Sequence, residues 1–135
     1  MPSLNPAPGS IEEMLAKVPA DTPILMLNLL RFNAQAQYPS ESGHAPCSGR
    51  EAYGRYGQVA GRKVAEAGGR VRLQTRALHA LIAPQGENWD QMLVVEYPSI
   101  AAFLTMLADQ EYSAATVHRT AALMDSRLIC TVEPN

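Results

Sequence analysis

The stretch from Ile24 to Phe32 constrains the fold of this chain more than any other. Six of its first seven residues are large and apolar, and they follow one another without the alternation of a half-buried strand. Such a run is typical of a strand that is covered on both faces. Asn28 is the only polar residue in the middle of the run. We therefore expect a central strand from Ile24 to Phe32, around which the rest of the chain packs.

Length and charge limit the classes of function. A chain of 135 residues is long enough for one domain with a single core. The net charge of -2 predicts no general attraction to nucleic acid or to acidic membranes. No apolar run reaches the roughly 18 residues of a transmembrane helix. We expect neither nucleic acid nor a membrane as a partner.

The compartment follows from the N-terminus and the cysteines. The first residues lack both the basic start and the apolar segment of a signal peptide. Cys47 and Cys130 lack the spacing of a metal or redox motif, so both are expected to be free thiols in a reducing compartment. The sequence thus indicates a cytoplasmic protein.

Positive charge is concentrated in one segment of the chain. Between positions 50 and 76, seven arginine and lysine residues accompany only two glutamates. Such a block is typical of solvated surface. The alternatives are a pocket mouth that attracts a small organic anion, or a patch that meets the acidic half of a second copy.

Hydrophobic periodicity and turn residues divide the rest of the chain. Residues 1 to 23 are expected to form an N-terminal arm with a short helix from Ile11 to Lys17. A loop insertion over 33 to 48 is low in large hydrophobics and is expected to be a mobile insertion or an interface arm rather than a lid. The remaining pattern predicts a helix that begins after Ser48 and ends at Ala67, followed by strands over 71 to 82 and 91 to 97. It then predicts helical segments from Ile100 to Met124, with a break near Asp109, and a last strand over 127 to 132.

The order strand, helix, strand, strand, helix, strand is the ferredoxin-like pattern of an α+β domain, here over residues 24 to 133. It predicts a four-stranded antiparallel sheet with the first and third strands at the centre, and we expect these two to run parallel to each other. With both helices on one side, the other face of the sheet is left in water. Because the central strands are apolar on both faces, we expect a second copy to cover that face, giving a homodimer whose two sheets enclose a barrel-like core.

Several short motifs in the second half of the chain resemble a known family. After a strand come an aromatic-Pro-Ser turn, a Glu-Tyr pair, an arginine seven residues further on, and a last strand entered through aspartate. The residues are Glu96-Tyr97-Pro98-Ser99, Asp109-Gln110-Glu111-Tyr112, Arg119 and Asp125-Ser126-Arg127-Leu128. This arrangement resembles the uncharacterised family named domain of unknown function 1330, over about residues 24 to 133. The resemblance implies membership of the dimeric α/β-barrel superfamily and a dimer, and it implies no established reaction. Related superfamilies include cofactor-free monooxygenases, lactone isomerases and haem-degrading enzymes.

Asn28 and Glu96 are the candidate catalytic residues. Each lies four residues after the start of a central strand, so in parallel neighbours they would lie close together on one face. A carboxylate buried among apolar side chains is a candidate general acid or base. The alternative is that Asn28 or an arginine, such as Arg119 or Arg127, simply satisfies Glu96.

Tyr53, Tyr56 and Arg119 are the candidate ligand-binding residues. The two tyrosines lie on the apolar stripe of the predicted helix, where they are either core anchors or hydroxyls at a pocket rim. Arg119 either binds an anion or ties the last helix to the last strand through Asp125. No metal and no cofactor are expected, because the three histidines lack metal-site spacing and no nucleotide-binding or nucleophile-elbow motif occurs.

These observations favour a small-molecule-binding dimeric α/β-barrel protein, such as a cofactor-independent monooxygenase or isomerase of a small aromatic or carboxylate compound. Asn28 and Glu96 would orient and deprotonate the ligand. The alternative is a non-catalytic structural or interaction homodimer. A cavity above about 300 Å³ reached by Asn28 or Glu96 would favour the first, and a filled core with Glu96 fully paired would favour the second.

Overall fold

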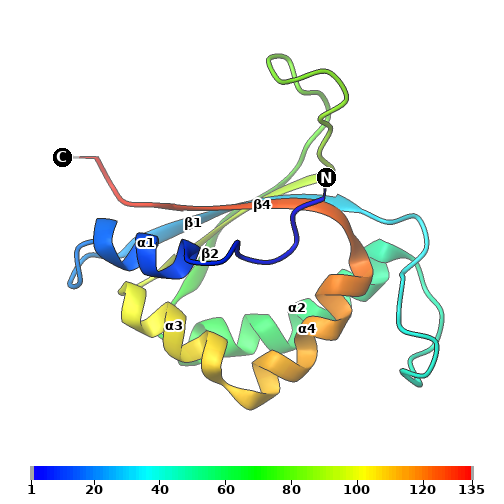
Figure 1. Cartoon of the computed structure of the whole chain (residues 1–135), viewed down its shortest axis with the longest axis horizontal. Coiled ribbons are helices and arrows are strands. Elements are labelled where there is room, and N and C mark those ends of the chain that lie inside the picture. Colours follow the sequence, from blue (N-terminus) through cyan, green and yellow to red (C-terminus); the bar gives the residue numbers. More distant parts are fainter. Residues whose placement is uncertain (1, 135) are drawn as a thin grey trace.

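In the computed structural model, which describes residues 2–134, a four-stranded sheet carries its helices on one face (Figure 1). The sheet has the order β2-β3-β1-β4. The elements are α1 (Ser10–Lys17), β1 (Ile24–Phe32), α2 (Gly49–Glu66), β2 (Arg70–Arg76), β3 (Gln91–Tyr97), α3 (Ile100–Ala108), α4 (Gln110–Ala122) and β4 (Leu123–Thr131). This is the expected ferredoxin-like α+β fold, and β1 has the predicted bounds.

Every pair of neighbouring strands is antiparallel, so the expectation that β1 and β3 run parallel is wrong. In the register of β1 and β3, Ile24 lies opposite Tyr97 and Leu30 lies opposite Gln91. The reason is the connectivity. The α2 crossover makes β2 run in the direction of β1, and β3 then reverses that direction because a hairpin joins it to β2.

The core lies between the sheet and the helices. Inward side chains of β1 and β3 alternate with side chains that point to the opposite face, as the pleat requires. The buried cluster combines both strands with α2, α3 and α4, and it includes Ile24, Met26, Val95, Tyr97, Tyr56, Val64, Phe103 and Tyr112.

Local capping chemistry sets most helix starts. Ser48 and Glu51 form the predicted capping box at the start of α2. Asp109 ends α3 and begins α4, where its Oδ1 accepts from the amide of Tyr112 at 2.9 Å. α1 differs from the expectation, because its N-cap is Gly9 and Ser10 is already helical.

Two strand boundaries differ from the prediction. β2 ends at Arg76 instead of Ile82, and residues 77–90 form a loop that stands away from the sheet (Figure 1). β4 begins at Leu123, four residues before the predicted start. The apolar residues that suggested a longer second strand lie in this loop. Those that suggested a longer last helix lie at the start of β4.

The insertion over 33 to 48 packs against α4 instead of standing apart. The amides of Asn33 and Gln37 donate to the carbonyl oxygens of Ala122 and Ala121, both at 2.8 Å. Tyr38 also bonds to His118 of α4 through its hydroxyl at 2.6 Å. These bonds fix both ends of the contact with α4, and the expectation of a mobile insertion or an interface arm stays a prediction.

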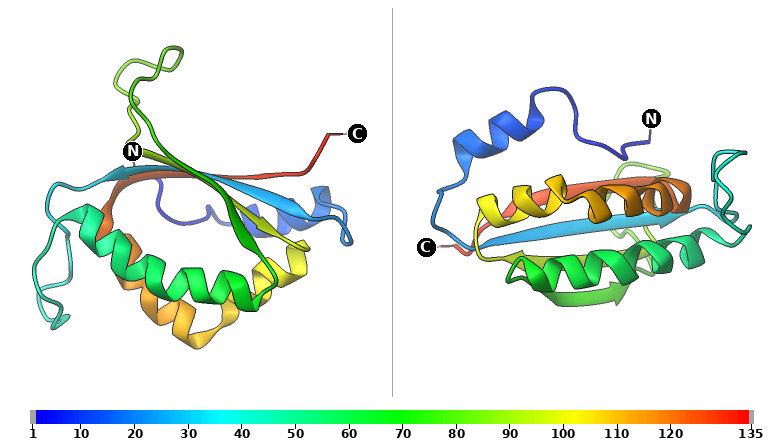
Figure 2. Two further views of the ribbon diagram at one scale, coloured as in Figure 1. Left: turned by 180° about the vertical axis from the view of Figure 1, so that it is seen from behind. Right: turned by 90° about the horizontal axis from the view of Figure 1, so that it is seen from below.

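The face of the sheet opposite the helices has no covering element among residues 2–134 (Figure 2). We call it the open face. Its apolar side chains come from all four strands and are Leu25, Leu27, Leu29, Leu73, Met92, Val94 and Ile129. Within the same described residues, no helix combines the length and the apolarity needed to cross a membrane.

Candidate functional site

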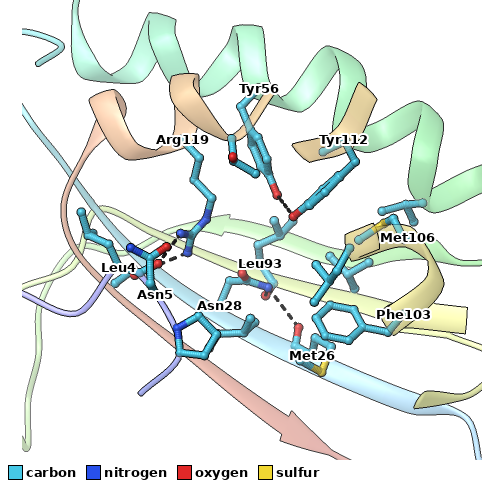
Figure 3. Close-up of a pocket in the computed structure, with 18 of the residues that line it drawn as sticks. Leu4, Asn5, Met26, Asn28, Tyr56, Leu93, Phe103, Met106, Tyr112 and Arg119 are labelled. Carbon is cyan, nitrogen blue, oxygen red and sulfur yellow. Dashed lines mark hydrogen bonds between the residues drawn. The ribbon is translucent and has the colours of Figure 1, made fainter. Parts of the chain in front are cut away.

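A cavity of about 750 Å³ lies between the inner face of the sheet and the helices (Figure 3). Its apolar walls come from the sheet, α2 and α3, and they include Met26, Leu93, Ala60, Phe103 and Met106. The N-terminal arm and α1 close one side of it. This volume falls within the range typical of small-molecule sites.

Of the two cations that line this cavity, Arg127 of β4 pairs with Asp125 and Glu87, and the other is Arg119 of α4. Its Nη1 donates to the carbonyl oxygen of Leu4 at 2.7 Å, and its Nη2 donates to Ser126 Oγ at 3.4 Å. Among residues 2–134, no carboxylate oxygen lies within 4.0 Å of its guanidinium. Within this described part of the chain, the hydrogen-bond partners of the Arg119 guanidinium are two neutral oxygens.

The N-terminal arm is held in place at this arginine. Ser126 Oγ donates to the carbonyl oxygen of Ser3, and the amide of Ser3 donates to Asp125 Oδ1 at 2.9 Å. With the bond from Arg119 to Leu4, three hydrogen bonds fix the arm beside the cavity. The tie between α4 and β4 runs through Ser126, whereas the sequence suggested Asp125.

Asn28 reaches the cavity from the middle of β1. Its Nδ2 donates to the carbonyl oxygens of Met26 and Leu93, both at 3.3 Å. These bonds use the amide nitrogen, so the amide oxygen is left as an acceptor for a ligand. Figure 3 shows Asn28 below Arg119 on the sheet side of the cavity.

Tyr53 and Tyr56 both line the cavity from α2, as expected. The hydroxyls of Tyr56 and Tyr112 form a hydrogen bond of 2.7 Å. Burial raises the pKa of Tyr53 to about 12, and burial followed by the neighbouring Tyr112 raises the pKa of Tyr56 further. These phenols therefore stay protonated at neutral pH and act as hydrogen-bonding groups.

The structure does not bring Glu96 and Asn28 together. Asn28 lies opposite Leu93 in the antiparallel register, whereas Glu96 lies opposite Leu25 and points to the open face. There Glu96 pairs with Arg72, and Arg70 approaches it at 4.0 Å. Glu96 does not line the cavity, because this register turns its side chain to the opposite face. The expected contact with Asn28 assumed that β1 and β3 run parallel.

The positive segment over 50 to 76 does not form the mouth of the cavity. Arg62 and Lys63 pair with Glu111 on α4, and these bonds hold α2 against α4. The hydrogen bond from Arg62, followed by the one from Lys63, lowers the pKa of Glu111 to about 2. None of the seven cations of this segment lines the cavity.

Histidine and cysteine contribute no metal centre among the described residues 2–134, where no group of three or more His, Cys, Asp or Glu is placed to hold an ion. Cys130 lines the cavity as a free thiol, and burial raises its pKa. The rings of His44 and His118 pack edge to face outside the cavity, with centroids 4.6 Å apart.

Sequence reasoning missed the part of the site that comes from the N-terminal arm. Ser3 and Leu4 lie far from Arg119 in sequence and carry no motif that links them to it. Ser126 and Tyr112 were named only as motif residues, although both line the cavity. Asn28 was the residue with a usable signal, as a polar group within an apolar strand.

The family model described as Domain of unknown function (DUF1330) matches residues 43–132, two thirds of the chain. This protein belongs to the DUF1330 family. The motifs from Glu96 to Leu128 lie within the matched region, and in this DUF1330 chain they supply Tyr97, Tyr112, Arg119 and Ser126 to the cavity.

Three solved structures are similar to this chain. A protein of unknown function from Rhodopseudomonas palustris is 37% identical, with a TM-score of 0.89 over 100% of this chain and 99% of that one. Its methylated form is also 37% identical, with a TM-score of 0.89 over 99% and 96% of the two chains. A protein from Bacteroides fragilis, described as dimeric, of unknown function and with a ferredoxin-like fold, is 13% identical, with a TM-score of 0.50 over 85% and 100%. That last likeness shows the fold alone. No curated protein matches this DUF1330 chain.

Proposed function

We propose that this DUF1330 protein binds a small organic molecule with an apolar, aromatic or aliphatic body and a carboxylate group. The observation that carries the proposal is Arg119, a cation that has no carboxylate partner among residues 2–134 and lies at the wall of a largely apolar cavity. Guanidinium and carboxylate form strong paired hydrogen bonds, and the interaction gains strength away from bulk water.

One other polar group suits the carboxylate, because Tyr53 offers a protonated hydroxyl as a donor. The amide oxygen of Asn28 is an acceptor and would instead meet a hydrogen-bond donor on the body of the ligand. The aromatic rings of Tyr56, Tyr112 and Phe103 give the apolar body a packing surface. The cavity exceeds the roughly 300 Å³ that separates a ligand site from a filled core.

The proposal is one of binding rather than proton transfer. An isomerase or a cofactor-independent monooxygenase needs a group that accepts a proton from its substrate near neutral pH. The lining residues described contain no carboxylate, histidine or lysine. Glu96, the candidate base, points to the opposite face of the sheet.

We also propose that the protein acts as a homodimer through its open faces. The seven apolar side chains of that face include Leu73 and Ile129, which are 46% and 48% exposed in the single chain. Stacking two such faces removes this surface from water and makes a self-complementary interface. Sedimentation at micromolar concentration is expected to give twice the 14.6 kDa of one chain. A well-folded species of single mass would contradict the dimer.

The binding proposal is tested by thermal unfolding with a panel of aryl and alkyl carboxylates and their methyl esters. We expect carboxylates to raise the unfolding midpoint of the wild type, because a ligand that binds only the folded state stabilises it. Arg119→Gln should lose at least about 10-fold in carboxylate affinity, and ester binding should change little. Arg76→Gln, which removes an exposed cation outside the cavity, is the matched control. If no compound of either class shifts any midpoint, the cavity is not a binding site.

A further inference from the structure

The loop between β2 and β3 exposes three large apolar side chains. Leu78, Leu81 and Ile82 are 83%, 84% and 94% exposed. No other large hydrophobic side chain among residues 2–134 exceeds 48%. Soluble chains scatter single apolar residues over their surface, but three nearly fully exposed residues within five positions mark an interaction site.

The base of this loop is firmly fixed to the sheet. The amide of Ala77 donates to the carbonyl oxygen of Asp90 at 3.0 Å, and the amide of Asp90 donates to the carbonyl oxygen of Leu30 at 2.8 Å. The carboxylate of Asp90 in turn accepts from the amide of Phe32 at 2.8 Å. The apolar tip is therefore presented on a defined stem.

A second set of contacts ties the stem to β4 across the open face. The guanidinium of Arg127 lies 5.0 Å from the centre of the Trp89 ring. The same guanidinium pairs with Glu87 at 3.3 Å. Because Arg127 belongs to the open face, these contacts join the loop to the surface that the homodimer would use.

The loop rises on the side of the sheet that the helices leave uncovered (Figures 1 and 2). We propose that residues 77–90 form a dimerisation arm, which places Leu78, Leu81 and Ile82 against the rim of the open face of a second copy of this chain. The inference rests on the homodimer proposed above and adds a second contact to it.

The area of the open face supports a second copy as the occupant. The strands β1 and β4 have nine residues each and β2 and β3 have seven, so at a rise of about 3.3 Å and a spacing of about 4.8 Å the sheet covers roughly 510 Å² in projection. A standard interface takes about 800 Å² from each partner. The sheet alone supplies less than that area, and an arm projecting from the same side supplies more.

Two-fold symmetry doubles the apolar surface that the arm adds to the dimer interface. In an isologous dimer each copy contacts the other through the same residues, so both arms are used at once. Six large apolar side chains would then leave water at the edges of the interface.

Charge argues against a lipid surface as the occupant. Residues 77–90 contain Glu87 and Asp90 and no lysine or arginine. Anionic membranes attract clusters of basic residues and repel acidic segments. The apolar tip therefore fits a protein surface better than an anionic bilayer.

The test measures dimer dissociation by sedimentation over a dilution series of the full chain. We expect the triple variant Leu78→Ser/Leu81→Ser/Ile82→Ser to raise the dimer Kd by at least about 10-fold, because it removes six large apolar side chains from the two-fold interface. The single variant Ile82→Ser should raise the Kd by a few-fold. Leu15→Ser, at a 46% exposed position on α1, is the matched control and should leave the Kd unchanged. Far-UV circular dichroism should show that all variants keep their fold, since the altered side chains make few contacts within the chain.

The outcomes separate this inference from the proposals on which it builds. A wild-type dimer whose Kd changes less than about 2-fold in the triple variant would overturn the arm and leave the sheet-face dimer standing. A monomeric wild type would overturn both. Cosedimentation of the wild type, but not the triple variant, with phosphatidylcholine–phosphatidylserine vesicles would assign the loop to lipid and overturn the arm. None of these results depends on ligand binding in the cavity.

Discussion

Arg119 holds the carbonyl oxygen of Leu4 at 2.7 Å, and this bond joins the last helix to the N-terminal arm across the cavity. The same guanidinium is the group that we propose receives the carboxylate of a ligand. We expect a bound carboxylate to draw this guanidinium away from Leu4, so that the ligand and the arm compete for Arg119.

This competition predicts that Arg119 controls the position of the arm. In Arg119→Gln the arm loses a charge-assisted hydrogen bond worth about 1.5–3 kcal/mol. We expect faster chymotryptic cleavage after Leu4 than in the wild type and in Arg76→Gln. A carboxylate ligand should accelerate the same cleavage in the wild type, and equal rates under all conditions would contradict the link.

Two glycines of α2 predict opposite effects of the same substitution. A Cβ at Gly49 would lie 2.1 Å from the carbonyl oxygen of Asn33, whereas a Cβ at Gly61 meets nothing within 4 Å. Gly49→Ala should therefore lower the free energy of unfolding by about 1–3 kcal/mol, as overpacking does. Gly61→Ala should raise it by up to about 1 kcal/mol through helix propensity. Denaturant titration of the two variants checks both signs.

The hydroxyl pair of Tyr56 and Tyr112 predicts non-additive losses of stability. Tyr56→Phe leaves the buried hydroxyl of Tyr112 without its partner and should cost about 1–3 kcal/mol. The double variant with Tyr112→Phe should cost less than the sum of the two single variants, because neither hydroxyl remains to be satisfied. A double-mutant cycle with additive losses would show that the hydrogen bond contributes nothing.

The lowered pKa of His118 predicts that the stability of the fold depends on pH. Burial, followed by the nearby His44 and Arg55, lowers the pKa of His118 from its ordinary value of 6.5. Arg55 donates to the hydroxyl of Tyr38, so that hydroxyl is free to donate to the unprotonated Nδ1 of His118. The unfolded chain binds this proton more readily, so the contribution to stability is complete above pH 6.5 and falls as the pH drops below it.

The measurement is denaturant unfolding at pH 7.5 and pH 5.5, for the wild type and for His118→Gln. The difference in the free energy of unfolding between the two pH values should be smaller in the variant. An equal difference in both proteins would assign the pH dependence to other groups.

The position of Glu96 on the open face predicts that its substitution lowers stability only slightly and leaves ligand binding in the cavity unchanged. Its pair with Arg72 lies on the open face, where the side chains are 28% and 39% exposed in the single chain. Glu96→Gln should therefore cost less than about 1 kcal/mol. The midpoint shift caused by a carboxylate ligand should equal that of the wild type. Loss of that shift would show that Glu96 reaches the ligand site.

The fold followed from the sequence wherever the signal was local or periodic. The apolar run from Ile24 to Phe32 predicted β1 with its observed bounds, and Ser48 with Glu51 predicted the start of α2. The turn after Tyr97 and the break at Asp109 likewise followed from residues within a few positions of each other. The loop at residues 77–90 was misassigned in part, because exposed Leu81 and Ile82 look like strand residues when burial is unknown.

The candidate site depended more on geometry. Asn28 was found because a polar side chain inside an apolar strand is conspicuous in sequence. Pairing Asn28 with Glu96 failed because the side-chain direction in a strand alternates, so the face depends on strand register and not on the distance from the strand start. No property of Ser3 or Leu4 by itself points to Arg119.

The sequence by itself therefore determined the order of the elements, their caps, and the apolar residues on both faces of the two central strands. These features depend on neighbouring residues and on periodicity. Only the tertiary structure decided which side chains share the cavity, which face carries Glu96, and that the arm closes on Arg119. Those relationships join residues far apart in the chain, such as Asn28 with Leu93 and Leu4 with Arg119, and strand register and chain packing bring them together.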